Sequence, residues 1–177
     1  MRWSKLRKSV EECLADEVKP IVTIHMTSYR NYDGYSRGWI EINKKEVVSF
    51  SDVDALDYRG STYHELTIEL FSTLDSKIFK YAGNGIKTNP DIPCSERSPG
   101  ALAELGEFSS SDFTKACFEH VTASRSNSIT SRHPLLRALA VIDRKVGLKK
   151  VEAAVNDIHP LVAYLASTRL QASKCSA

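Results

Sequence analysis

Apolar residues recur with two different periods along this chain, and the change of period is the strongest constraint on its fold. In residues 21–50 they tend to alternate at every second position, which is typical of strands with one buried face. In the last third they recur at every third or fourth position, which is typical of helices packed on a core. Strands early and helices late predict an α+β fold, in which a small antiparallel sheet packs against helices.

The expected sheet consists of one strand and a β-hairpin. Residues 21–28 form the single strand, and residues 39–42 and 47–50 form the hairpin, joined by residues 43–46. Trp39 then lies on one face of the hairpin together with Glu41. The opposite, apolar face is shared by four residues: Ile40, Ile42, Val48 and Phe50.

Helix starts and stops are also visible in the sequence. Ser4 is the expected N-cap of the first helix, and Ser109 with Asp112 forms a capping box. The His-Pro pairs at 133–134 and 159–160 place proline at the first position of a helix, and Gly147 is an expected helix stop. The expected helices cover residues 4–15, 62–81, 109–123, 134–146 and 148–155, and a last one begins at residue 160.

The length of 177 residues fits one ordinary domain. We therefore expect a single domain over residues 1–177. It comprises a helix, the sheet and a helix over 1–81, a long loop over 82–107 and a helical part over 108–177. The loop is rich in Gly and Pro, and loops of this length are often functional.

No targeting or membrane segment stands out. The first residues lack the apolar stretch of a secretory signal, and the longest apolar run, residues 161–166, is far shorter than the roughly 18 residues of a membrane span. The four cysteines are scattered and do not form a metal-binding pattern. We therefore expect a cytoplasmic protein with free thiols, among which Cys13 and Cys117 fall in apolar helical patterns and belong to the core.

No motif predicts a cofactor, a metal site or catalytic residues. His64-Glu65 begins like a zinc protease helix, but the second histidine is missing, and Gly83-Asn84-Gly85 lacks the third glycine of a dinucleotide loop. The acidic run at Asp52, Asp54 and Asp57 could hold Mg²⁺ or Ca²⁺. We favour a simpler interpretation, in which one of these aspartates caps a neighbouring element.

Two histidine arrangements invite a catalytic interpretation. Cys117 and His120 lie one helical turn apart, but a core thiol is inert. His133 and His159 both precede Pro-Leu and could share a site if they converged. Helix initiation explains the repeated pattern without a shared site, and we favour it.

Aromatic and basic residues cluster between the first strand and the hairpin. Tyr, Trp and Arg are enriched at the energetic centres of protein interfaces, and aromatic rings also stack on bases in single-stranded nucleic acid. The alternative is that these rings cover the edge of the sheet or lie in the core. The candidate binding residues of this cluster are Tyr29, Arg30, Tyr32, Tyr35, Arg37 and Trp39.

The net charge of +2 hides an asymmetry. Residues 1–120 hold 15 Lys and Arg against 19 Asp and Glu, a formal charge of −4, whereas residues 121–177 hold 9 against 3, a charge of +6. Arg137 and Arg144 are seven positions apart and are expected on one exposed helix face, which could meet phosphates or an acidic protein. A helix-turn-helix around Gly147 is disfavoured, because Asp143 sits where the two helices should touch. The other basic candidates are Arg132, Lys145, Lys149 and Lys150.

Three segments carry a resemblance. They are Met1–Lys8 (MRWSKLRK), Arg37–Ile40 (RGWI) and Pro134–Gly147 (PLLRALAVIDRKVG). Together they resemble a family of uncharacterised small bacterial proteins of about this length. The resemblance implies a bacterial cytosolic origin and transfers no catalytic residue.

These observations favour a non-enzymatic binding protein that recognises a protein partner. By analogy, we expect an inhibitor similar to the immunity proteins of bacterial toxin systems, with a toxin as its partner. The first alternative is a nucleic-acid-binding module that uses the basic C-terminal helices. The second is a metal-dependent enzyme with a site around Asp52 and Asp54. No membrane partner is expected.

Overall fold

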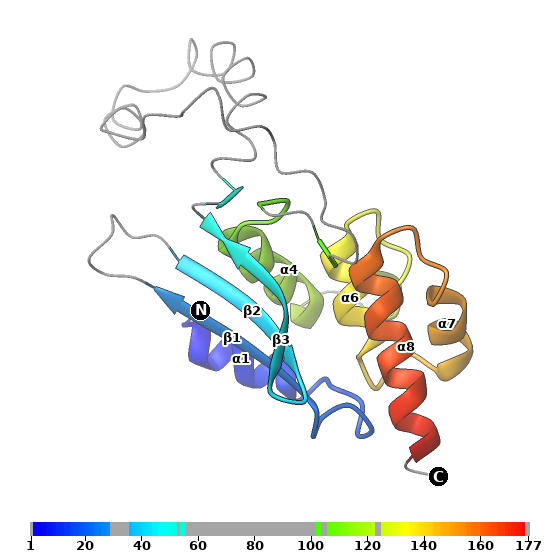
Figure 1. Cartoon of the computed structure of the whole chain (residues 1–177). Coiled ribbons are helices and arrows are strands. Elements are labelled where there is room, and N and C mark those ends of the chain that lie inside the picture. Colours follow the sequence, from blue (N-terminus) through cyan, green and yellow to red (C-terminus); the bar gives the residue numbers. More distant parts are fainter. Residues whose placement is uncertain are drawn as a thin grey trace, which may run out of the picture.

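The computed structural model describes residues 2–28, 36–52, 54–55, 102–103, 106–122 and 125–175. Within them, a three-stranded antiparallel sheet is followed by helices, so the expected α+β class is confirmed (Figure 1). The helix expected at 62–81 and most of the loop expected at 82–107 lie outside the described residues.

The sheet has the strand order β1-β2-β3, with β1 at Val22–Ser28, β2 at Ser36–Ile42 and β3 at Lys45–Ser51. β2 and β3 form the expected hairpin, but their turn is only two residues long. Asn43 and Lys44 both have positive φ angles, of 53° and 64°, which is the conformation of a type I′ turn. This turn matches the twist of the two strands, so pairing continues to Lys45 instead of stopping at Val47.

The inner face of the sheet is the apolar one. Ile24, Ile40 and Phe50 are each at most 1% exposed. The Phe50 ring stacks on Phe113 of helix α4 (Ser110–Thr122), with ring centroids 4.4 Å apart. The expected alternation within the hairpin, with Ile40 facing inward and Trp39 facing outward, is therefore confirmed.

Two helices lie against this inner face, α4 and the first helix, α1 (Trp3–Glu11). The expected N-cap of α1 is wrong: Arg2 is the N-cap, and its carbonyl accepts hydrogen bonds from the Lys5 and Leu6 N–H groups. Ser4 instead lies inside the helix. For α4 the capping box is confirmed, since Ser109 Oγ accepts a hydrogen bond from the Asp112 N–H (3.1 Å) and donates one to its carboxylate (2.8 Å).

α1 ends at Glu11, four residues before its expected end at residue 15. The reason is a long-range contact. Leu14 forms a β-bridge with Asp143, where the Ala15 N–H donates to the Ile142 carbonyl and the Arg144 N–H donates to the Cys13 carbonyl. These bonds require an extended backbone, which a continuing helix could not provide.

The helical part consists of α5 (Arg125–Ser128), α6 (Pro134–Val141), α7 (Leu148–Ala154) and α8 (Pro160–Cys175). Both expected His-Pro helix starts are confirmed, but the expected role of Gly147 is wrong. α6 already ends at Val141, and Gly147 is the N-cap of α7, with a φ of −68°. The turn between α6 and α7 is therefore longer than the sequence suggests. No helix among the described residues is long and apolar enough to span a membrane.

Candidate interaction surface

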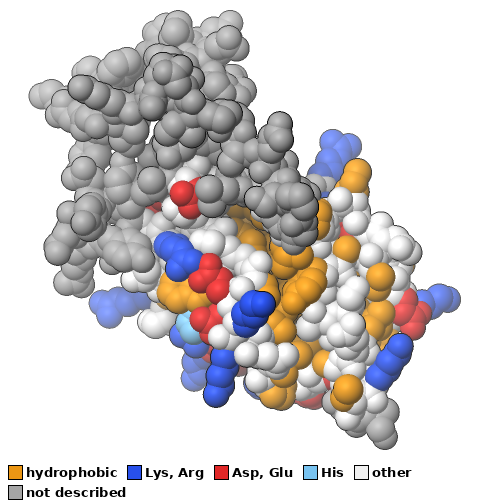
Figure 2. Space-filling model, in the orientation of Figure 1, with side chains coloured by type: hydrophobic (Ala, Val, Ile, Leu, Met, Phe, Trp, Pro, Cys, Tyr) orange, Lys and Arg blue, Asp and Glu red, His pale blue; other side chains and the backbone are white. Residues whose placement is uncertain are grey.

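The outer face of the sheet is the face turned away from α1 and α4 (Figure 1). Its central residue is Trp39, which pairs in register with His25 on β1 and with Ser49 on β3. In Figure 2 hydrophobic, basic, acidic and histidine side chains lie together over these strands. We refer to seven residues as the outer sheet face: Thr23, His25, Arg37, Trp39, Glu41, Glu46 and Ser49.

The Trp39 ring contacts two side chains. The His25 ring stacks on it, with centroids 5.0 Å apart and an interplanar angle of 12°. The Arg37 guanidinium carbon lies 5.1 Å from the Trp39 ring centroid, which is the geometry of a cation–π contact. The tryptophan is therefore partly buried by polar neighbours and is not covered by a helix of the described part.

Glu41 holds this arrangement together. It accepts a hydrogen bond from Trp39 Nε1 (2.9 Å) and one from Thr23 Oγ1 (3.4 Å), and its carboxylate lies 3.3 Å from His25 Nε2. The hydrogen bond from Trp39 lowers the pKa of Glu41, and the nearby His25 adds to this effect against the opposing cost of desolvation. Glu41 thus remains an acceptor down to lower pH than an isolated glutamate.

Arg37 is fixed in the same way. Its guanidinium forms an ion pair with Glu46 and donates a hydrogen bond through Nε to Ser49 Oγ (2.9 Å). Its side chain is still 33% exposed. The outer sheet face therefore presents a preformed cluster of aromatic and charged groups, and little side-chain freedom remains to be lost on binding.

The sequence-predicted binding residues fall into two groups here. Arg37 and Trp39 lie on the outer sheet face as described. Tyr29, Arg30, Tyr32 and Tyr35 lie outside the described residues, in the segment that connects β1 to β2.

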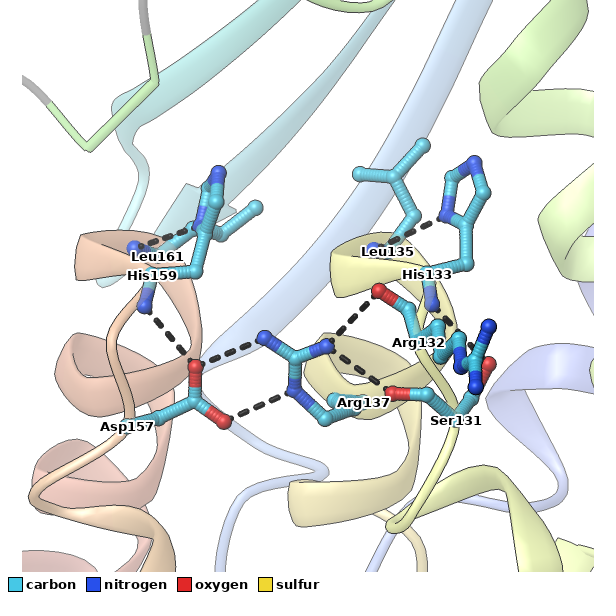
Figure 3. A network of polar contacts seen from close by, with 8 residues as sticks. All are labelled: Ser131, Arg132, His133, Leu135, Arg137, Asp157, His159 and Leu161. Atoms are coloured by element: carbon cyan, nitrogen blue, oxygen red, sulfur yellow. Dashed lines mark hydrogen bonds and ion pairs between the residues drawn. The ribbon is translucent and has the colours of Figure 1, made fainter.

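The second predicted surface, on the basic C-terminal helices, is not assembled as expected. Arg137 lies on α6, but Arg144 follows the end of that helix, so the two do not share a helix face. Arg137 is also occupied (Figure 3). It forms a bidentate pair with Asp157, with both N–O distances at 2.8 Å, and its NH1 group donates to the carbonyls of Ser131 and Arg132.

The pair of Arg137 and Asp157 is structural in character. The two side chains are only 14% and 13% exposed. The hydrogen bonds that Arg137 donates lower the pKa of Asp157, and the same bonds raise the pKa of Arg137. The exposed basic residues of this region are instead Arg132, Arg144, Lys145, Lys149 and Lys150.

Both His-Pro histidines cap their own helices, as expected. His133 Nδ1 accepts a hydrogen bond from the Leu135 N–H, and His159 Nδ1 accepts one from the Leu161 N–H, each at 3.3 Å (Figure 3). Their rings lie 5.8 Å and 5.7 Å from the Phe108 ring. The two helix starts are therefore neighbours, and each Nδ1 is used in capping.

Asp52 is also used in capping. Its carboxylate accepts hydrogen bonds from the Ser110 N–H (3.0 Å) and the Ser110 hydroxyl (2.9 Å), as well as from the Ser36 N–H (2.9 Å). It thereby joins the start of α4 to the sheet. Among the described residues, no group of three or more His, Cys, Asp or Glu side chains could hold a metal ion.

Sequence reasoning missed a buried polar network between α4, α8 and the turn after α6. His120 Nε2 lies 3.0 Å from Asp143 Oδ2, and the two side chains are 1% and 0% exposed. Arg169, 4% exposed, donates to the carbonyls of Val141 and Asp143 and pairs with Glu17 at 2.8 Å. The available signal was an aspartate directly after an apolar run, as at position 143.

Cys117 and His120 do not form a catalytic pair. Burial raises the pKa of the Cys117 thiol to about 12, so it stays protonated at neutral pH. His120 Nε2 is directed to Asp143, and Nδ1 has no hydrogen-bond partner among the described residues. Both side chains belong to the core, as expected for Cys117.

Fold and site together define an α+β chain with helices on one face of a three-stranded sheet and a preformed aromatic and charged cluster on the other. The chain belongs to the SF0329 protein family, whose model matches residues 2–170. The match covers nearly the whole chain, in agreement with the resemblance noted from three separate segments. Comparison with curated proteins finds no match, and neither does comparison with solved structures.

Proposed function

We propose that this chain is a non-enzymatic cytosolic accessory protein that recognises a protein partner through its outer sheet face, much as immunity proteins of bacterial toxin systems do. The observation that carries the proposal is the packing of His25 and Arg37 on the half-buried Trp39 ring. Trp and Arg dominate the energetic centres of interfaces because each combines a large contact area with a polar group.

The existing hydrogen bonds and ion pairs of the outer sheet face also support recognition of a partner. Its polar groups already have partners within the sheet, as shown for Glu41 and Arg37. Binding would therefore bury Trp39 without leaving unpaired charges. The burial of unpaired charges is the usual free-energy penalty of a polar interface. Inhibition of the partner would follow from steric occlusion together with complementary charge.

A binding experiment with matched variants tests this proposal. The products of neighbouring genes are purified and titrated against the chain. Trp39→Ala should weaken binding by more than about tenfold, as expected for an aromatic residue at an interface centre. Tyr164→Ala, which truncates an exposed aromatic ring on α8, serves as the control and should change affinity by less than about twofold.

The proposal is wrong if the partner binds both variants as tightly as the unchanged chain. It is equally wrong if no neighbouring gene product binds at all. Far-ultraviolet circular dichroism of both variants must show that they are folded, so that weaker binding reports the surface.

The nucleic-acid alternative retains one specific observation. Arg144, Lys145, Lys149 and Lys150 are exposed around the α6–α7 turn, and no ion pair engages them within the described part of the chain. If these residues contact phosphates, the affinity for RNA or DNA should fall steeply as the salt concentration rises. At a fixed salt concentration, the double variant Arg144→Ala with Lys149→Ala should bind more weakly than the unchanged chain. Undetectable binding at low salt removes this alternative.

A metal-dependent site around Asp52 and Asp54 has less support. Both carboxylate oxygens of Asp52 accept protein hydrogen bonds that join α4 to the sheet. A metal ion would have to displace them. The geometry therefore favours the two binding proposals.

A further inference from the structure

The two edges of the sheet differ in how they are protected. Edge strands with unpaired backbone groups are prone to pair with other chains, and proteins commonly block them with charged residues or β-bulges. β3 has both devices: Lys45 and Glu46 lie at its start, and Val47 is an extra residue between the pairs Ile40–Val48 and Glu41–Glu46.

β1 has neither device. Its seven residues, VTIHMTS, include no Lys, Arg, Asp, Glu or Pro, and they pair with β2 in unbroken register from Val22 to Ser28. Within the described residues β1 pairs with β2 alone. The Val22 N–H donates to the Val18 carbonyl, and beyond it the other edge of β1 offers a regular row of backbone groups. Such an edge can accept an extended segment as a fourth strand.

The surroundings of this edge indicate what the segment should carry. α1 lies beside β1 on the inner side of the sheet (Figure 1). Arg2 is its N-cap, Lys5 lies in its first turn and Lys8 lies in its last turn. All three are exposed, and no acidic residue occurs in the first turn. The helix N-terminus adds partial positive charge at the same end.

The orientation of α1 places Arg2 and Lys5, at its N-terminal end, near one end of β1. The Trp3 ring lies 6.0 Å from Phe113, and Phe113 packs beneath Gly38, which pairs with Met26. The N-terminal end of α1 therefore lies near the C-terminal end of β1. A strand added beside Met26–Ser28 would begin next to the N-terminal turn of the helix, which carries Lys5, and could extend along the helix toward Lys8.

We propose that the partner supplies an extended acidic segment, which adds to β1 as a fourth antiparallel or parallel strand and directs carboxylates toward Lys5 and Lys8. This inference rests on the proposed function, because it names the part of the partner that binds. A second copy of the chain fits less well. The β1 strand of a second copy, VTIHMTS, has no carboxylate that could meet Lys5 and Lys8.

Three seven-residue peptides and the intact chain test the inference. The first peptide alternates Glu with Val or Thr, the second has Lys in place of Glu, and the third is the acidic peptide with alternate backbone nitrogens methylated. N-methylation removes strand hydrogen bonds without changing charge. Binding is measured by fluorescence anisotropy at low salt, and amide hydrogen exchange locates the site.

The acidic peptide should bind and protect β1 amides from exchange, and each of the other two should bind at least about tenfold more weakly. Lys5→Glu with Lys8→Glu should weaken binding of the acidic peptide by about tenfold. The matched control is Lys149→Glu with Lys150→Glu, the same charge reversal on exposed lysines of α7, and it should change affinity by less than about twofold.

Three results overturn the inference: no binding of the acidic peptide at millimolar concentration, equal binding of all three peptides, or a dimer of the chain with protected β1 amides. A partner that depends on Trp39 while β1 stays unprotected would leave the proposed function standing and remove strand addition alone. If the acidic peptide binds β1 but no partner depends on Trp39, strand addition stands and the proposed function through the outer sheet face is removed.

Discussion

The outer sheet face and the network around Asp143 use the same kinds of side chain under opposite conditions. On the sheet, Arg37, Glu41 and His25 are a quarter to a third exposed and surround an aromatic ring. In the helical part, Asp143 and His120 are fully buried and connect segments distant in sequence. The first arrangement leaves an organised surface for recognition, whereas the second secures the fold.

The two regions differ in how far apart in sequence the paired charged groups lie. Arg37 finds Glu46 and Ser49 on the adjacent strand, so its pairing is local to the hairpin. Arg169 reaches the carbonyls of Val141, the last residue of α6, and of Asp143 just beyond it, and also the carboxylate of Glu17. Removing a group from the buried network should therefore cost much more stability than removing one from the sheet surface, and the following variants measure this contrast.

The largest effect is expected for Asp143→Ala. The change leaves the buried His120 ring and the Lys145 N–H without their acceptor, which should lower the free energy of unfolding by about 3 to 4 kcal/mol. Asp16→Ala, at an exposed aspartate, should change it by less than about 0.5 kcal/mol. Urea unfolding measures both, and similar values for the two variants would contradict the structural role of Asp143.

Gly38→Ala tests the inner face of the sheet directly behind the proposed surface. A Cβ atom at position 38 would lie 2.8 Å from a ring carbon of Phe113, which is itself stacked on Phe50. We expect a loss of about 1 to 3 kcal/mol from overpacking. Gly147→Ala, where no atom lies within 4 Å and φ is negative, should be tolerated. Equal thermal stability of the two variants would show that Phe113 can move aside.

Arg137→Ala and Arg144→Ala separate a structural arginine from a surface one. The first removes the bidentate pair with Asp157 and should cost about 1 to 2 kcal/mol, whereas the second should cost less than about 0.5 kcal/mol. Chemical unfolding provides the comparison. If Arg137→Ala leaves stability unchanged but abolishes nucleic-acid binding, our assignment of Arg137 to the fold is wrong.

Asp157→Asn should change how the stability of the folded protein depends on pH in the acidic range. The folded-state pKa of Asp157 is below its ordinary value of 3.8, chiefly because Arg137 donates hydrogen bonds to it. The pair therefore stabilises the protein fully above that ordinary value, and the contribution is lost as the pH falls through the lower folded-state pKa. The variant should be less stable at neutral pH and lose less on acidification, as measured by thermal unfolding between neutral and acidic pH. An unchanged pH dependence would contradict this.

The smallest effect is expected for Arg37→Gln on the outer sheet face. Because its ion pair with Glu46 is partly exposed, stability should fall by no more than about 0.2 to 1 kcal/mol. Affinity for a protein partner should fall further than stability. A loss of stability as large as that of Asp143→Ala would remove the contrast between the two regions.

Local patterns predicted much of this fold. Alternating apolar residues indicated the hairpin and its buried face, the Ser109–Asp112 spacing indicated the start of α4, and the two His-Pro pairs indicated α6 and α8. Each of these signals lies within a few residues of the structure that it specifies. The placement of Trp39 on the outer face followed from the same alternation.

Several of the errors have a common physical origin in partners that are far away in sequence. α1 stops early because residues 13–15 pair with residues 142–144, and the same pairing accompanies the early end of α6. Asp52 caps α4 through Ser110, 58 positions later, so capping by an aspartate was predicted from the acidic run, but the distant helix that it caps was not. Arg144 is off the helix for the same reason, since its N–H is used by Cys13.

The ion pair between Glu17 and Arg169 has a consequence for how the protein is made. These residues are 152 positions apart, and Arg169 lies near the middle of the last helix. This contact cannot form during synthesis until Arg169 has emerged from the ribosome. Contacts of such long separation also slow folding. The three strands of the sheet lie close together in sequence and can pair early. The unblocked edge of β1 is then exposed during the interval when nascent chains are most prone to associate.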